Sequence, residues 1–156
     1  MELTIRDARP DDAPRLAELV SQLGYPTSAA AVAARLERLR VRESDRVVVA
    51  ESEGDVVGLA SLHVSQPLEY DEPTARVSAL VVDEAQRRRG IGEALVGELE
   101  AEARRRRCCL LYLTTAEQRT DAHAFYRRYH LIPVDGSNRL YLKVATAEAV
   151  LAKTGG

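Results

Sequence analysis

Apolar residues along this chain recur at every second position in some segments and at every third or fourth position in others. Leu3 and Ile5 alternate with polar neighbours, which predicts a short strand. Residues 12–23 then carry apolar side chains at helical spacing, and residues 28–40 repeat that spacing with an arginine-rich opposite face. The first forty residues are therefore expected to form one strand followed by two helices.

Polar residues and prolines mark where these two helices should begin. Asp11 or Asp12 can cap the first helix, and Pro14 suits its first turn because proline tolerates the missing amide there. Ser28 or Thr27 can cap the second helix in the same way.

The middle of the chain has the pattern of a long antiparallel pair. Residues 46–52 and 54–66 predict two strands joined at Glu53-Gly54-Asp55, a sequence typical of a hairpin turn. After a polar connection, residues 76–82 predict a third strand beside them. The expectation is an antiparallel pairing that extends over residues 57–82.

The remaining pattern predicts a mixed α/β protein. An amphipathic helix is expected over about 90–106, a buried strand over 108–115, a short helix opened by Asp121, and two final strands within 131–134 and 139–144. The order β α α β β β α β α β β belongs to a layered α/β architecture. At 156 residues the whole chain, 1–156, fits one domain.

Composition excludes several function classes. Lysine and arginine total 22 against 24 aspartate and glutamate, a formal net charge of -2, so the chain as a whole is not a nucleic-acid binder. The run Arg104–Arg107 lies at a helix end, where cations complement the dipole. Cys108 and Cys109 are adjacent, which suits neither a metal site nor a disulfide framework and fits a reducing cytoplasm. Because no stretch has the length of a signal or membrane segment, we expect a soluble cytoplasmic protein with no metal and no membrane partner.

One short segment carries candidate chemistry: Arg87, Arg88 and Arg89 precede Gly90 and Gly92, directly before a predicted helix. Glycine lets a backbone approach a ligand closely, and amides at a helix N-terminus attract anions. The residues do not fit a Rossmann fingerprint or a Walker loop, whose further glycine or Lys-Ser/Thr pair is absent. A basic loop that caps a surface helix and binds nothing is the alternative explanation.

The pattern Arg-x-x-Gly-x-Gly from Arg87 to Gly92, after a strand ending at Val82, resembles the pyrophosphate-binding motif of the GNAT acetyltransferase superfamily. The resemblance covers about residues 3–144 and implies a mixed, mostly antiparallel central sheet flanked by helices. It also implies that acetyl-CoA is bound along the preceding strand and over the loop, with a backbone amide at Val82 facing the acetyl carbonyl. The residues implied in binding are Leu80, Val81, Val82, Arg87, Arg88, Arg89, Gly90, Ile91, Gly92 and Glu93.

A second segment, residues 121–131, resembles the family's other signature, with Ala122, Phe125 and Tyr126 in register. The resemblance implies that Tyr126 protonates the departing thiolate, and an ordinary tyrosine pKa near 10 suits a proton donor. Two residues depart from the family pattern, because Arg119 replaces an asparagine and His130 replaces a glycine.

These motifs together predict an N-acetyltransferase that moves an acetyl group from acetyl-CoA to a primary amine in a ternary complex. The alternative is an inactive acetyl-CoA sensor or interaction module of the same fold. The amine, a small molecule or a peptide, is not readable, although acidic residues before the third strand weakly favour a cationic one. Family resemblance also implies a possible homodimer. Candidates for the acceptor side are Tyr25, His63 and Glu69, and the general base stays open among carboxylates that include Asp71, Glu72 and Asp83.

Overall fold

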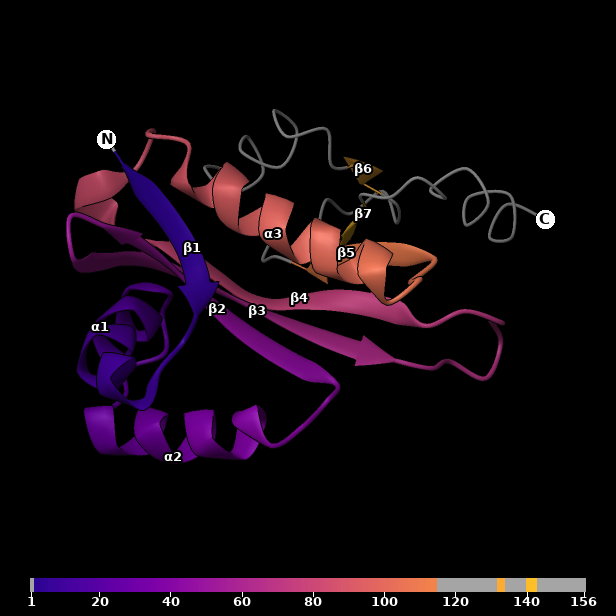
Figure 1. The fold of residues 1–156 in the computed structure, drawn as a ribbon, viewed down its shortest axis with the longest axis horizontal. Helices are drawn as coiled ribbons and strands as arrows, with labels where there is room; N and C mark the ends of the chain where they lie inside the picture. Colours follow the sequence, from indigo (N-terminus) through magenta and orange to yellow (C-terminus); the bar gives the residue numbers. More distant parts are fainter. Residues whose placement is uncertain (1, 115–131, 134–139, 143–156) are drawn as a thin grey trace. The chain divides into compact units, whose positions relative to one another are not determined.

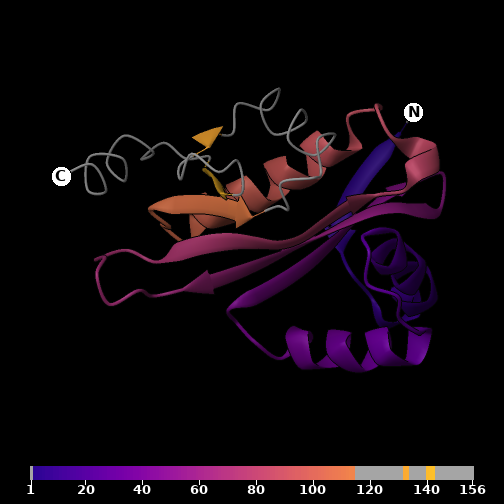
Figure 2. The ribbon, with the colours of Figure 1, turned by 180° about the vertical axis from the view of Figure 1, so that it is seen from behind.

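The computed structural model describes residues 2–114, 132–133 and 140–142. The chain divides into two compact units, which are described separately here (Figures 1 and 2). The first unit comprises residues 1–63 and 78–99, and the second comprises residues 64–77 and 100–156. Strands β3 (Asp55–Ser65) and β4 (Thr74–Val82) and helix α3 (Ile91–Arg105) contribute residues to both units.

The first unit begins with strand β1 (Leu3–Asp7), a 3-10 turn (Pro10–Asp12) and helices α1 (Ala13–Gln22) and α2 (Ala29–Arg40). Strands β2 (Asp45–Ser52), β3 (Asp55–Ser65) and β4 (Thr74–Val82) follow, then a second 3-10 turn (Glu84–Gln86) and helix α3 (Ile91–Arg105). In the sheet the order is β1, β2, β3, β4. β1 pairs with β2 antiparallel, and β2 pairs with β3 antiparallel.

The contacts between β3 and β4 confirm the expected antiparallel pair. The hydroxyls of Ser61 and Ser78 lie 2.6 Å apart, and nearer the loop the amide of Asp83 donates to the carbonyl of Val57 at 2.8 Å. From the first contact to the second, the residue number falls along β3 and rises along β4, so the two strands run in opposite directions.

Helices cover both faces of this part of the sheet (Figures 1 and 2). On one face, α1 and α2 bury a cluster with the sheet whose centre is Leu16, Leu19, Leu36, Val49 and Leu59. On the other face lies α3, because Gly58, adjacent to Leu59 in an alternating strand, points at α3. Helix α3 is thereby fixed to the sheet over its first turns.

The caps of the two early helices differ from each other. Ser28 caps α2 as expected, accepting a hydrogen bond from the amide of Ala31 at 3.1 Å. The expected cap of α1 is wrong in its chemistry, since the side chain of Asp12 makes no cap bond to α1. Its oxygens instead accept from the Arg6 guanidinium at 2.8 and 3.0 Å and from the Arg9 amide at 2.7 Å.

In the second unit, β5 (Leu110–Thr114) pairs in parallel with the first part of β4, from Thr74↔Leu110 to Val77↔Leu113. Strand β7 (Leu140–Leu142) pairs antiparallel with β5, and β6 (Ile132–Pro133) pairs antiparallel with β7. The mixed sheet and the order of elements agree with the sequence prediction within the described residues. The expected helix after Asp121 lies outside them.

Candidate functional site

The predicted anion-binding loop lies between β4 and α3, and two of its residues have a left-handed backbone conformation. Arg88 has a φ of +67° and Gly90 a φ of +78°. Helical hydrogen bonding begins only afterwards, where the amide of Ala94 donates to the carbonyl of Gly90 at 3.1 Å. The amides of Ile91 and Gly92 precede that bond and lie at the positive end of the α3 dipole. Left-handed residues directly before a helix shape a concave run of amides, which is an anion-binding geometry.

The loop begins with three consecutive arginines, and all three are exposed: Arg87, Arg88 and Arg89. The space above Gly90 is open, because a Cβ built there meets nothing within 4 Å. Positive charge, helix N-terminus and open space therefore coincide at one place.

The first turns of α3 pack closely against strand β3. Ile91, Leu95 and Leu99 are almost completely buried, with exposures of 1%, 0% and 0%. Beneath them Gly58 of β3 has no side chain, and a Cβ there would lie 3.0 Å from Leu95 Cδ1 and 3.2 Å from Ile91 Cγ2. Glycine at position 58 thus permits the close approach that sets the position of the helix.

A network of hydrogen bonds holds the point where β4 becomes the loop. Asp83 accepts from the amide of Ala85 at 3.1 Å, from the Arg15 guanidinium and from the Gln22 amide at 3.4 Å. Gln22 in turn accepts from the amide of Glu84 at 3.0 Å. The Ala85 amide, followed by Arg15, lowers the pKa of Asp83 despite partial burial, so this carboxylate stays charged. An engaged carboxylate of low pKa is a poor proton acceptor, which argues against Asp83 as the general base.

Sequence patterns did not reveal Arg15 and Gln22. The two residues are seven apart on α1, so they share one helix face, and this spacing is the single signal the sequence offers. Their partner lies 68 and 61 residues away along the chain.

The strand residues expected to bind acetyl-CoA lie at the end of β4. Val81 is buried, and Leu80 and Val82 are half-buried. The ladder between β4 and β5 extends from Thr74 to Val77 within the described part of the chain. Leu80, Val81 and Val82 therefore continue β4 past the end of that ladder.

The predicted acceptor-side residues have different surroundings. Tyr25 follows α1 and is 68% exposed. His63 is exposed on β3, and its Nδ1 lies 3.1 Å from Oδ1 of Asp45, whose other oxygen accepts from the Ser44 hydroxyl at 2.8 Å. Glu69 is exposed and belongs to the second unit. Tyr126, with Arg119 and His130, lies outside the described residues.

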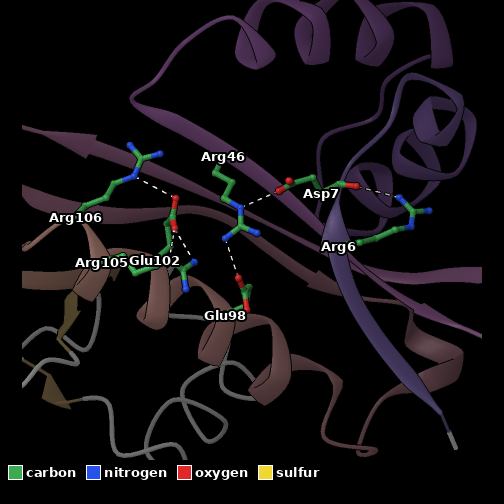
Figure 3. A network of polar contacts seen from close by, with 7 residues as sticks. All are labelled: Arg6, Asp7, Arg46, Glu98, Glu102, Arg105 and Arg106. Carbon is green, nitrogen blue, oxygen red and sulfur yellow. Dashed lines mark hydrogen bonds and ion pairs between the residues drawn. The ribbon is translucent and has the colours of Figure 1, made fainter.

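Several other arginines form ion pairs with carboxylates (Figure 3). Arg46 of β2 bridges Asp7 of β1 and Glu98 of α3, with both distances 2.8 Å. Near the C-terminal end of α3, Glu102 pairs with Arg105 at 2.6 Å and Arg106 at 3.2 Å. This arrangement agrees with a solvated helix end for the run Arg104–Arg107.

The described residues contain neither a membrane-spanning helix nor a cluster of metal-binding side chains. Over residues 2–114, 132–133 and 140–142, no helix combines the length and apolar character needed to cross a bilayer. The same residues contain no group of three or more histidine, cysteine, aspartate or glutamate side chains placed to bind a metal.

Comparison with known proteins decides the family. The model described as "Acetyltransferase (GNAT) family" matches residues 12–130 of this chain, from α1 through the loop to His130. The chain belongs to the GNAT family. The loop from Arg87 to Gly92 is part of the matched region.

Three relatives show how far the similarity reaches. An aminoalkylphosphonate N-acetyltransferase from Salmonella typhimurium is 39% identical over 75 residues, which are 48% of this chain and 49% of that protein. The chain thus matches about half the length of this curated relative. An aminoglycoside N-acetyltransferase, AAC(6')-Iy, solved with CoA, has a TM-score of 0.75 at 16% identity over 85% of this chain and 89% of its own. Glucosamine-6-phosphate N-acetyltransferase from Arabidopsis thaliana has a TM-score of 0.73 at 20% identity, covering 85% and 93%. These two structures share the GNAT fold with the chain.

Proposed function

We propose that this GNAT protein transfers the acetyl group of acetyl-CoA to a primary amine by direct attack in a ternary complex. The observation that carries the proposal is the loop: Arg88 and Gly90 in left-handed conformations at the start of α3, flanked by exposed arginines. Amides and guanidinium groups in this arrangement suit a diphosphate such as the one that CoA carries. The open space above Gly90 leaves room for it.

The reaction makes one bond and breaks another at the thioester carbon. A neutral amine nitrogen attacks the acetyl carbonyl, an oxyanion forms, and the C–S bond breaks as the amide bond remains. Family resemblance assigns the backbone amide of Val82 to the carbonyl oxygen and Tyr126 to protonation of the departing thiolate. In this scheme Tyr126→Phe lowers kcat strongly and leaves the Kd for acetyl-CoA within about twofold.

The amine must lose a proton, and two observations bear on the group that takes it. Asp83 is engaged by Arg15, Ala85 and Gln22. The imidazole of His63 is oriented by Asp45 through Nδ1, and when Nδ1 carries the proton Nε2 is left as the acceptor nitrogen. We therefore place His63, oriented by Asp45, on the acceptor side. Its test compares His63→Gln with Asp45→Asn: both should lower kcat for the amine while the Kd for acetyl-CoA is unchanged.

The first amines to assay follow from the relative's name and from charge. The Salmonella protein is named for aminoalkylphosphonates, which combine a primary amine with an anionic group. Cationic polyamines are the opposite class, suggested by the exposed acidic residues Glu69, Asp71 and Glu72. A panel containing both classes, an amino sugar and a lysine peptide identifies the acceptor by release of the CoA thiol.

Calorimetric titration of acetyl-CoA tests the binding step, with Gly90→Glu as the disruptive variant. A glutamate there brings negative charge to the loop and strains a φ of +78°. Gly54→Glu is a matched control, because Gly54 has a φ of +84° and open space but lies in the turn between β2 and β3. Both variants should lose similar stability, and only Gly90→Glu should lose binding. Failure of the wild-type protein to bind acetyl-CoA would overturn the proposal.

A second function, an acetyl-CoA sensor without turnover, is kept open by the departures at Arg119 and His130. Binding without thiol release across the whole amine panel would favour the sensor. Turnover that is lost in Tyr126→Phe would exclude it.

A further inference from the structure

Helix α1 contributes two side chains that bond to Asp83 and Glu84. These two residues form the joint between β4 and the loop. The Arg15 guanidinium spans three groups: its Nε donates to the carbonyl of Val56 at 2.8 Å, its Nη2 pairs with Asp83, and its Nη1 pairs with Glu18 at 2.7 Å. Gln22, two turns later, both donates to Asp83 and accepts from the amide of Glu84. The joint is thus held by α1 as well as by the strands.

The bonds to Asp83 and Glu84 constrain the backbone that leads into the loop. Asp83 follows the last residue of β4, and its own amide donates to the Val57 carbonyl at 2.8 Å. Glu84 opens the 3-10 turn that leads into Arg87. Because the amide of Glu84 is bonded to Gln22 and the carboxylate of Asp83 to Arg15, both of these consecutive residues are bonded to one face of α1.

The burial of this network indicates that it is more than a surface ion pair. The Asp83 side chain is 16% exposed and that of Arg15 is 31% exposed. Removal of the guanidinium would leave a half-buried carboxylate with one neutral side-chain donor, Gln22, and the Ala85 amide. An ion pair of this kind restricts geometry as well as adding energy, since the planar guanidinium bonds in fixed directions.

We propose that Arg15 and Gln22 are positioning residues of the cofactor site. They fix the joint at Asp83–Glu84, so that the loop from Arg87 to Gly92 is already in its binding conformation before acetyl-CoA arrives. The inference rests on the proposed function of that loop. It extends the site to a helix that neither the pyrophosphate motif nor the strand before it includes. Preorganisation of this kind raises affinity because less ordering remains to be done on binding.

The test separates positioning from general stability by means of a matched arginine. Arg6 also pairs with two carboxylates, Asp12 at 2.8 Å and Glu51 at 2.7 Å, and its side chain is 16% exposed, but these partners lie in the turn before α1 and on β2. Arg15→Gln and Arg6→Gln should show comparable losses of unfolding free energy in urea. Arg15→Gln alone should weaken binding of CoA about tenfold in calorimetry, which corresponds to about 1.4 kcal/mol, whereas Arg6→Gln should change it by less than about twofold.

Three further experiments connect the effect to the joint. Hydrogen exchange of a peptide covering residues 84–92, measured without ligand, should be about tenfold faster in Arg15→Gln and unchanged in Arg6→Gln. The double variant Arg15→Gln/Asp83→Asn should bind CoA no more weakly than the worse single variant, because both changes open the same contact. Gln22→Ala should weaken CoA binding in the same direction.

The outcomes distinguish this inference from the proposed function. If wild-type protein binds CoA and Arg15→Gln binds it equally well, with unchanged exchange at residues 84–92, the positioning role is refuted while the function stands. If wild-type protein does not bind CoA, both are refuted. If Arg15→Gln and Arg6→Gln weaken binding equally, the effect is one of stability alone and the positioning role is again refuted.

Discussion

Substitution of Gly58 tests whether the packing of α3 on β3 sets the position of the loop. A Cβ at position 58 would meet Leu95 Cδ1 at 3.0 Å, Ile91 Cγ2 at 3.2 Å and the backbone carbonyl oxygen of Val81 at 3.2 Å. The leucine methyl can turn aside, but a backbone carbonyl in a strand cannot. Alanine at position 58 must therefore displace the Val81 carbonyl of β4. It must also displace the first turn of α3, because the β-branched side chain of Ile91 is stiff at χ1.

The expected cost follows from overpacking of a close-packed interior. Forcing an extra methyl group into such a core destabilises a protein by about 1–3 kcal/mol. For a chain of this size that loss lowers Tm by about 2–12 °C. Because Ile91 begins the helix directly after the loop, its displacement also moves the amides of Ile91 and Gly92, and acetyl-CoA should bind about tenfold more weakly.

A double-mutant cycle assigns this cost to its source. Leu95→Ala removes the nearest methyl, so Gly58→Ala should cost less in that background than in the wild type, with a remainder from the Val81 carbonyl. Gly54→Ala, which adds a methyl in open space at a φ of +84°, should lose stability from backbone strain alone, independently of Leu95. Urea unfolding and calorimetry with acetyl-CoA give both quantities. Unchanged stability and affinity in Gly58→Ala would refute the packing argument.

Three further predictions concern single side chains. Ser28→Ala removes the cap of α2 and should cost about 1 kcal/mol, whereas Ser28→Asp should keep the stability, as judged by urea unfolding. Asp12 has a pKa below its ordinary value, chiefly because Arg6 bonds to it. The unfolded chain therefore takes up the proton first, so the advantage of wild type over Asp12→Asn should be complete above about pH 5 and shrink as pH falls below about 4; a difference that grows in acid would contradict this. Burial raises the thiol pKa of Cys108, so the variant that keeps only this cysteine should be alkylated by iodoacetamide at pH 8 more slowly than the variant that keeps only Cys109, and equal rates would contradict the burial.

Local patterns were sufficient for the elements of the first unit. Ser28 was identified as a cap because capping depends on neighbours within three residues. The glycines of the loop were identified because a left-handed conformation at Gly90 is a property of the backbone itself. Wherever the deciding interaction lies within one turn or one strand, the sequence carries the information.

Long-range ion pairs were beyond the reach of those patterns. Asp12 has the right type and place for a cap of α1, yet Arg6, on β1, and the Arg9 amide take its oxygens. The contact of Arg15 with Asp83 joins residues 68 positions apart. Charged side chains recur often in this chain, and the choice of partner depends on the fold that brings them together, so sequence spacing alone could not assign them.

The left-handed Arg88 has a consequence for how this protein could be engineered. A residue with a Cβ pays about 1–2 kcal/mol in that conformation, which glycine would not. A chain selected for stability alone would carry glycine or asparagine at position 88. Replacing Arg88 by glycine should therefore raise the melting temperature. Because it also removes one cation from the loop, the proposed function predicts weaker binding of acetyl-CoA by the same variant.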